Sequence, residues 1–441
     1  MGDKNFKDFR VTALLGAGVN MGLDLGIVPN TYNLTEKVVN APYPIVDIVT
    51  NQQRNSDLLQ YIYHTICENF SEGPLNPATS YGKVHFEILF HVLENLYSYK
   101  YFAENHGKNQ KFPNAYVPPF AYFAKVDTPY TSSEIQQVMK QYITILMENV
   151  NLYNEAYKNN ICDVNKHYKD FWALAPHKWD VFTLNYDTTI ENSLSTYEDG
   201  YVEIDPKYVF KKFMPEQLLK SQNNTINHLH GCINYCAENM ELEEYNKEYI
   251  YCYDSDDYVR WNVYADAMKF WKSFSRSNLL AQNHEVIFPS PIITGLNKTE
   301  KITSLPFNTY KQNLSLKIES NNALLIAGYS FGDLYLNREI ERMRLYHGDN
   351  WRTVIIDYWD LGDDDMSERD KLKNYLWTHH PNQDLVHMIL KVAQEPVLDG
   401  GIFLEKNKGQ FVSKNGQLML FVNGMQDALQ YQNEIYAFLQ S

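Results

Sequence analysis

The stretch Arg10–Gly22 reads RVTALLGAGVNMG and contains the two signals on which the expected fold depends. Its first six residues are short, apolar and bounded by glycine, which is typical of a strand buried on both faces. The GAG that follows predicts a tight turn, where backbone N–H groups can approach a pyrophosphate at a helix N-terminus, although ordinary turns share this glycine spacing. The stretch therefore predicts the first strand and turn of an α/β domain.

Further short apolar runs alternate with longer helical patterns, which indicates a largely parallel sheet. The expected strands are Arg10–Leu15, Asp180–Leu184, Ile226–Leu229, Glu285–Phe288, Ala323–Ala327 and Thr353–Asp357. Apolar residues at three- and four-residue spacing predict helices over Ser56–Phe70, Tyr81–Glu104 and Ser132–Tyr157, the last with a capped start at Ser132. The proline-rich segment Lys111–Thr131 predicts a loop.

The expected architecture is an α/β fold with a Rossmann-like, mostly parallel sheet, a large helical insertion at about residues 56–177 and a small C-terminal α+β appendage. Residues 1–360 would form the ligand-binding domain. Residues 361–441 would form the appendage, which suits oligomerisation or partner binding. Within it, Gly401–Lys406 and Gln417–Val422 predict a hairpin that turns at 414–416, and a last helix runs over Met425–Leu439.

Composition limits the function classes. The chain has 441 residues, 44% of them hydrophobic, so it can bury a sizeable core without disulfides or a structural metal. Its formal net charge of −15 disfavours sequence-independent binding to nucleic acid, which needs clustered Lys and Arg. The start lacks the plan of a secretion signal, and no apolar run is long enough to span a membrane. The five cysteines favour reduced thiols in a cytoplasm.

The second expected strand ends in Phe182-Thr183-Leu184-Asn185-Tyr186-Asp187. If the backbone stays extended, Asn185 and Asp187 project to the same side of the chain. They would then lie at the carboxyl edge of the sheet, where open α/β sheets bind ligands. Alternatively, they only satisfy a turn at the end of the strand.

The third expected strand ends in Asn227-His228-Leu229-His230-Gly231, which places two imidazoles two residues apart. A histidine at this edge is a natural general base, and a core histidine is the alternative. A metal site would combine these histidines with Cys232, Cys236 and Cys252. That set is weak because the Cys-x3-Cys spacing lacks a second pair.

A fourth strand end, Ala327-Gly328-Tyr329-Ser330-Phe331-Gly332-Asp333, is another turn of small residues, suited to close approach of a ribose or adenine. Four such ends in one chain favour a single shared ligand crevice. The P-loop pattern is absent from the sequence, so ATP hydrolysis is not expected.

Together these segments resemble the sirtuin-like family of bacterial NADases, whose members carry a GAG loop, T-x-N-Y-D, L-H-G and G-Y-S-F-G-D. The resemblance covers roughly residues 10–340 and implies that residues 1–360 bind and cleave NAD⁺. It implies that Gly16, Ala17, Gly18, Asn20, Gly328 and Ser330 contact NAD⁺, with the glycine turn at the pyrophosphate and Ser330 at the adenosine ribose. The chain departs from the family at Asn20, where serine is usual, and at Gly26–Pro29, where Gly-x-Pro arrives late.

By the same resemblance Asn185 would lie at the nicotinamide ribose and His230 would be the catalytic base. Asp187 would either bind the nicotinamide amide or support the loop. Nicotinamide leaves as a neutral molecule, so the reaction needs no general acid, unlike ordinary glycoside hydrolysis. The expected products are nicotinamide and ADP-ribose, with NAD⁺ as substrate and no metal.

Two other functions remain open from the sequence. Deacylases of the sirtuin family usually carry two Cys-x-x-Cys pairs of a zinc ribbon, and this chain has none. A non-catalytic sensor of NAD⁺ or ADP-ribose would keep the glycine turn but lose the asparagine or histidine. The resemblance further implies an antiphage effector that depletes NAD⁺ and is restrained by homo-oligomerisation or by a partner such as a HerA-type ATPase or short Argonaute.

Overall fold

The computed structural model describes a set of ranges that covers most of the chain. They are residues 9–21, 23, 31–47, 49–69, 84–105, 129–160, 162–206, 208–237, 258–273, 279–280, 286–288, 290–295, 304–362, 366–376, 403–407 and 409–441. Most of the predicted proline-rich loop, Cys252 and the late Gly-x-Pro segment at Gly26–Pro29 lie outside the described residues.

A nine-stranded sheet forms the centre of the fold, in the order β15-β16-β17-β14-β13-β1-β4-β8-β5. Its strands are β15 (Phe403–Asn407), β16 (Gln410–Ser413), β17 (Leu418–Phe421), β14 (Arg352–Ile356), β13 (Ala323–Ala327), β1 (Arg10–Leu15), β4 (Lys178–Thr183), β8 (Asn224–His228) and β5 (Tyr197–Glu198). All pairs from β17 to β5 are parallel. The predicted α/β fold with a mostly parallel sheet is therefore confirmed.

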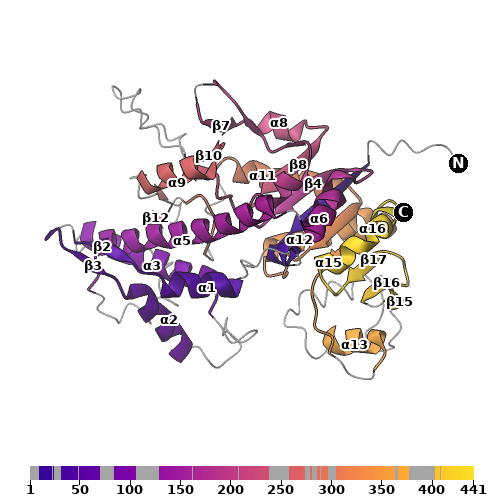
Figure 1. Ribbon diagram of the computed structural model, residues 1–441, viewed down its shortest axis with the longest axis horizontal. Coiled ribbons are helices and arrows are strands. Elements are labelled where there is room, and N and C mark those ends of the chain that lie inside the picture. Colours follow the sequence, from indigo (N-terminus) through magenta and orange to yellow (C-terminus); the bar gives the residue numbers. More distant parts are fainter. Residues whose placement is uncertain are drawn as a thin grey trace.

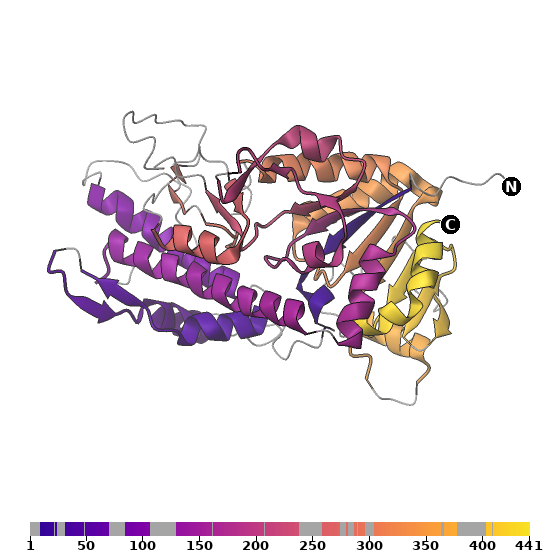
Figure 2. The same ribbon diagram turned by 45° about the horizontal axis from the view of Figure 1, so that its top comes forward.

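Helices cover both faces of this sheet (Figure 2). On one face lie α11 (Phe307–Ser320) and α12 (Leu334–His347), and on the other lie α6 (Asp163–Ala173) and α16 (Gln432–Leu439). The strands are apolar on both faces for this reason. In β13, Leu324 and Ile326 pack with the α11 and α12 side, whereas Leu325 packs with the α6 and α16 side.

A helical lobe stands beside the sheet (Figure 1). It contains α1 (Thr31–Asn40), α2 (Leu58–Asn69), α3 (Phe86–Asn105) and α5 (Ser132–Asn159), with a hairpin of β2 (Pro44–Val46) and β3 (Gln53–Asn55). The predicted helices of the insertion are thus present, and α1 and the hairpin join them from before residue 56. The helix α5 starts at Ser132, as predicted, and its N-cap is the preceding residue Thr131, which forms a capping box with Glu134.

A second, four-stranded sheet lies above α5 in Figure 1. Its order is β6 (Tyr201–Val202), β7 (Phe210–Phe213), β10 (Tyr258–Trp261) and β9 (Tyr235–Ala237), with α7 (Thr189–Ser193), α8 (Pro215–Leu219) and α9 (Tyr264–Ser273) around it. The prediction that Glu285–Phe288 is a strand buried in the main sheet is wrong. Among the described residues, β12 (Val286–Ile287) pairs with β11 (Leu279–Leu280) alone, in an antiparallel pair of two residues each. An apolar run of three residues cannot distinguish these two cases.

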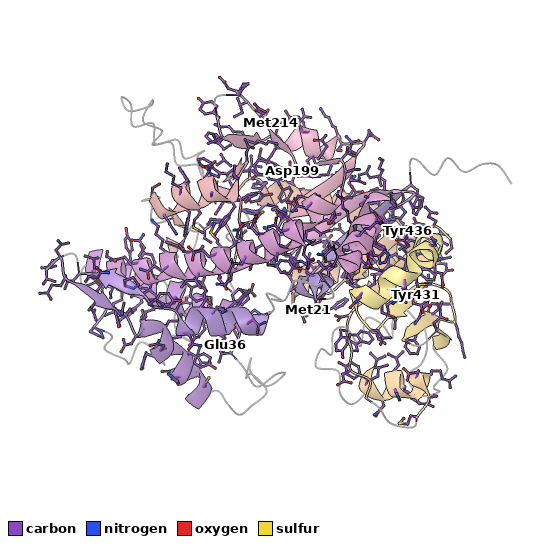
Figure 3. All side chains as sticks on the ribbon, in the orientation of Figure 1. Met21, Glu36, Asp199, Met214, Tyr431 and Tyr436 are labelled. Carbon is purple, nitrogen blue, oxygen red and sulfur yellow. The ribbon has the colours of Figure 1, made fainter. Side chains whose placement is uncertain are left out.

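The C-terminal segment extends the central sheet. The predicted hairpin has three strands, since residues 410–413 form β16 between the two expected ones, and the turn at 414–416 joins β16 to β17. Because β17 pairs in parallel with β14, the last strands continue the main sheet. In the chain, α13 (Glu368–Asn374) precedes these strands, and α15 (Met425–Ala428) and α16 follow them. Tyr436 of α16 points toward α6 (Figure 3). Among the described residues, no helix has the length and hydropathy needed to cross a membrane.

His177 yields a first prediction, on pH and stability. Its ring is buried against Trp179 and Tyr436, and burial lowers its pKa from 6.5 to about 3. The unfolded chain therefore binds a proton at pH 5 that the folded chain does not. Protonation of the unfolded chain therefore lowers the free energy of unfolding by about 2 kcal/mol at pH 5, and has no effect well above pH 6.5. We expect His177→Phe to remove that loss, measured by urea unfolding at pH 7.5 and pH 5.

His167 provides the matched control, because it lies exposed on α6. The variant His167→Phe should keep the wild-type difference between the two pH values. Equal pH dependence in wild type and His177→Phe would contradict the prediction.

Candidate functional site

The four sequence motifs follow four neighbouring strands. In the sheet β13, β1, β4 and β8 are adjacent and parallel, so their carboxyl ends meet at one edge. Three motifs begin directly after their strands, at Gly16, Leu229 and Gly328, and T-x-N-Y-D begins at Thr183, the last residue of β4. The fold therefore brings the motifs together from stretches that lie up to about 300 residues apart in the chain.

The glycine turn after β1 is in direct contact with the turn after β13. Gly16 N donates to Ala327 O at 3.0 Å and Gly18 N donates to Gly328 O at 3.0 Å. A Cβ on Gly16 would stand 2.4 Å from Gly328 O, and a Cβ on Gly328 would stand 1.9 Å from Val19 N. Gly328 also has a φ of +61°. These glycines are required because the two turns cross with no room for side chains.

Asn185 joins the turn after β4 to the glycine turn. Its side-chain Nδ2 donates to Gly16 O at 3.1 Å, and its backbone N donates to Thr183 Oγ1 at 3.0 Å. The residue is half-buried. The carboxamide is therefore held in one orientation at the sheet edge.

Asp187 and Asn20 bind each other beneath the glycine turn. Asn20 Nδ2 donates to Asp187 Oδ2 at 3.0 Å, and Thr189 N donates to Asp187 Oδ1 at 2.9 Å. The Tyr168 hydroxyl donates to Asn20 Oδ1 at 3.4 Å. Burial raises the pKa of Asp187 above its ordinary value. Of the two expected roles of Asp187, these contacts favour support of the loop.

His230 lies beside the N-terminal end of α12. Its Nε2 is 3.6 Å from Asp333 Oδ2, and its backbone O accepts from Ile293 N at 2.7 Å. Asp333 caps α12, because its Oδ1 accepts from Tyr335 N and Leu336 N. The cap leaves the second carboxylate oxygen on the side of His230. The motif after β8 and the motif after β13 thus meet through this pair.

The turn after β13 is held in an unusual conformation. Phe331 has a φ of +57°, which is rare for a residue with a large side chain. Asn337 Nδ2 donates to Phe331 O at 2.8 Å, and the Tyr329 hydroxyl lies 3.0 Å from both Asp333 O and Asn337 Oδ1. Ser330 is exposed on this turn. The sequence did not predict the role of Asn337, which lies on α12 outside every motif.

His228 has neighbours quite different from those of His230. It is fully buried, with Nε2 2.7 Å from Glu191 Oε1 and Nδ1 3.2 Å from Asn185 O. Arg260 lies 3.4 Å from the same Glu191 oxygen and also pairs with Asp199. Of the two interpretations of a histidine at this strand end, His228 fits the core histidine, since it lies in a buried ion-pair network.

Of the three cysteines in the metal hypothesis, Cys252 lies outside the described residues, and Cys232 and Cys236 have different neighbours. Cys232 lies near Glu191 and His228, with potential ligand atoms within 4.8 Å of one another. Glu191 is already paired with His228 and Arg260, however, so we assign these residues to the ion-pair network. The Cys236 thiol contacts Ala267 O at 3.5 Å instead.

Comparison with known proteins was made by family and by curated relatives. Residues 180–379 match the family model described as the SIR2-like domain, and no curated protein matches the chain. The matched range contains the motifs of Asn185, His230 and Gly328, and the glycine turn precedes it. A SIR2-like domain is consistent with an activity that uses NAD⁺. The match over residues 180–379 therefore supports a sirtuin-like family for this part of the chain.

Proposed function

We propose that the chain cleaves NAD⁺ at the bond between nicotinamide and ribose, giving nicotinamide and ADP-ribose. One observation carries the proposal: a continuous series of contacts joins the four motifs. Asn185 contacts Gly16, the glycine turn contacts Gly328, and Asp333 of the same turn lies beside His230. This edge is where open α/β sheets bind nucleotides.

Asn185 suits the ribose side of such a reaction. Nicotinamide leaves neutral, so the site must hold the ribose, tolerate an oxocarbenium-like transition state and direct a water. An uncharged carboxamide does this without trapping the cation. With Nδ2 donating to Gly16 O, the side-chain Oδ1 is the atom that can accept from a ribose hydroxyl or a water.

His230 would accept the proton from that water or hydroxyl. Taking up a proton makes the imidazole cationic. The Asp333 carboxylate, 3.6 Å away, would stabilise this charge. The α12 cap holds that carboxylate in place, so the proposed base has a fixed anionic neighbour.

The remaining residues would shape the site. The turn at Gly16, Ala17 and Gly18 would hold the pyrophosphate, and exposed Ser330 would contact the adenosine ribose. Asn20 and Asp187, which bind each other, would hold the glycine turn from within.

The direct test is to incubate the purified chain with NAD⁺ and measure nicotinamide and ADP-ribose. A hydrolase needs NAD⁺ alone. A deacylase should release nicotinamide only when an acyl-lysine peptide is added, and a sensor should release none under either condition. Either of the last two results would overturn the proposal.

Replacement of Asn185 with alanine should lower kcat for nicotinamide release by about 10²-fold, because the ribose and water lose their orientation. The control is Asn322→Ala. Asn322 Nδ2 donates to Asn350 O just before the start of β13, at the opposite end of that strand from Gly328, and this variant should keep wild-type kcat. Unchanged turnover in Asn185→Ala would remove this residue from the site.

As an antiphage effector, the chain would need its activity restrained, because unrestrained hydrolysis would deplete the NAD⁺ of the cell. We propose that an oligomeric assembly or a partner protein supplies it. The same assay, run across protein concentrations and with the product of the neighbouring gene, should show a change in specific activity. A constant specific activity in every condition would contradict this regulation.

A further inference from the structure

His228 is buried with both ring nitrogens facing hydrogen-bond acceptors. Nδ1 lies 3.2 Å from the Asn185 carbonyl O, and Nε2 lies 2.7 Å from Glu191 Oε1. A carbonyl oxygen and an ionised carboxylate can only accept. Both contacts are satisfied together only when both nitrogens carry hydrogen, that is, when the ring is an imidazolium.

The surrounding charges support this form. Arg260 lies beside Glu191 and pairs with Asp199, so two cationic and two anionic side chains form one buried network. Burial alone would lower the pKa of His228, but Glu191 outweighs it and the net direction is upward. Burial likewise would raise the pKa of Glu191, and the charges of His228 and Arg260 lower it instead. The ionised pair is therefore the consistent state.

The network has a definite place in the fold. Glu191 belongs to α7, His228 ends β8 and Arg260 comes from β10 of the second sheet. Asp199, labelled in Figure 3, lies just after β5. The other titratable groups that act on His228 or lie near its ring are Asp187 after β4, Cys232 after β8 and Tyr235 of β9. The network ends at the backbone of Asn185, the residue proposed to hold the ribose.

We propose that His228 is a positioning residue for Asn185: its Nδ1–H donates to the Asn185 carbonyl and fixes the backbone from which the carboxamide projects. The inference rests on the proposed cleavage of NAD⁺. His228 does not contact the substrate in this role. It acts through Asn185, and Glu191 keeps the ring oriented by accepting from Nε2.

A double-mutant cycle with Asn185→Ala tests the coupling. His228→Leu removes the donor at similar size and should lower kcat for nicotinamide release by about 10²-fold with little change in KM. In the Asn185→Ala background the same change should lower kcat by less than about threefold, because the group it positions is gone. A merely structural role would lower kcat equally in both backgrounds, and that result would overturn the inference.

A conservative variant separates the hydrogen bond from the charge. His228→Gln lacks the charge but has an amide nitrogen that can donate to the Asn185 carbonyl, so it should recover most of the kcat lost in His228→Leu. If His228→Leu fails to fold, His228→Gln alone still tests the hydrogen bond, because it should keep most of the wild-type kcat. If His228→Gln is as impaired as His228→Leu, the donated hydrogen bond is not what positions Asn185, and the inference fails.

The matched control is Asp180→Asn. Asp180 is a buried carboxylate on β4, paired with Arg10 and Lys317 at the opposite end of the strand from Asn185. Its removal disturbs a comparable ion network, and its effect should be additive with Asn185→Ala. Coupling as strong as that of His228 would contradict the inference.

Imidazole ¹⁵N signals of the full chain test the ring without reference to activity, with His228→Gln used to assign the resonance. At pH 7.5 both nitrogens of His228 should be protonated, and a singly protonated ring would overturn the inference. Absence of nicotinamide release by the wild type would defeat the proposed function instead. The ring signals would then decide whether His228 donates to Asn185.

Discussion

Replacement of His230 with alanine is expected to lower kcat for nicotinamide release by about 10²–10⁴-fold, the range for loss of a general base. The reason is that no other imidazole among the described motif residues takes this position. His228, two residues earlier, is buried and engaged by Glu191 and Asn185. The dissociation constant for NAD⁺ should change little, because the base acts on a proton and not on the dinucleotide framework. Steady-state nicotinamide release and calorimetric titration with NAD⁺ measure the two quantities.

His347 offers the matched control for this variant. It lies at the other end of α12 from Asp333, where its Nε2 contacts Ile318 O at 2.9 Å. His347→Ala removes a part-buried imidazole from the same helix and should retain wild-type kcat. If His230→Ala stays within about threefold of wild type, or if His347→Ala loses as much, His230 is not the base.

The strands nearest the site were the most predictable part of the fold. The predicted Arg10–Leu15 and Ala323–Ala327 coincide with β1 and β13. Both strands are covered by helices on each face, and all their residues except Arg10 are apolar or β-branched. The predicted starts of β4 and β8, at Asp180 and Ile226, lie two residues after the observed starts. Those strands begin with polar residues, Lys178 and Asn224, which do not resemble a buried strand.

The small strands of the second sheet could not be predicted in the same way. Its strands β6, β7 and β9 have only two to four residues each. Too few residues alternate in such a strand for a pattern to be recognised. The helix α1 was missed for a different reason, since its residues Thr31–Asn40 include three polar or β-branched positions at its start.

The ion-pair network also left no signal in the sequence. Glu191 and Arg260 are separated by 69 residues, and neither belongs to a motif. The pairing depends on the second sheet folding back on the end of β8. The sequence linked the glycines to close approach of a ligand, and the structure adds that they allow two turns of the chain to cross. The network and the crossing both involve contacts between distant segments, which local patterns do not contain.

Replacement of Gly328 with alanine is expected to destabilise the fold more than any other single change considered. A Cβ there would stand 1.9 Å from Val19 N and 2.2 Å from Gly18 C, both backbone atoms that a side-chain rotation cannot move aside. The φ of +61° adds about 1–2 kcal/mol for a residue with a Cβ. Overpacking adds about 1–3 kcal/mol, or separates the two turns. We expect a loss of about 2–5 kcal/mol in unfolding free energy, measured by urea denaturation.

Gly416 separates the backbone cost from the crossing of the turns. It has a φ of +70° in the turn between β16 and β17, but a Cβ there would meet nothing within 4 Å. Gly416→Ala should therefore cost only the conformational part, about 1–2 kcal/mol, and leave nicotinamide release unchanged. Gly328→Ala, in contrast, should lose that activity even in the fraction that remains folded, because its Cβ would displace the turn bound by Asn185. Equal destabilisation of the two variants, with activity kept in both, would show that the turns after β1 and β13 do not need their close contact.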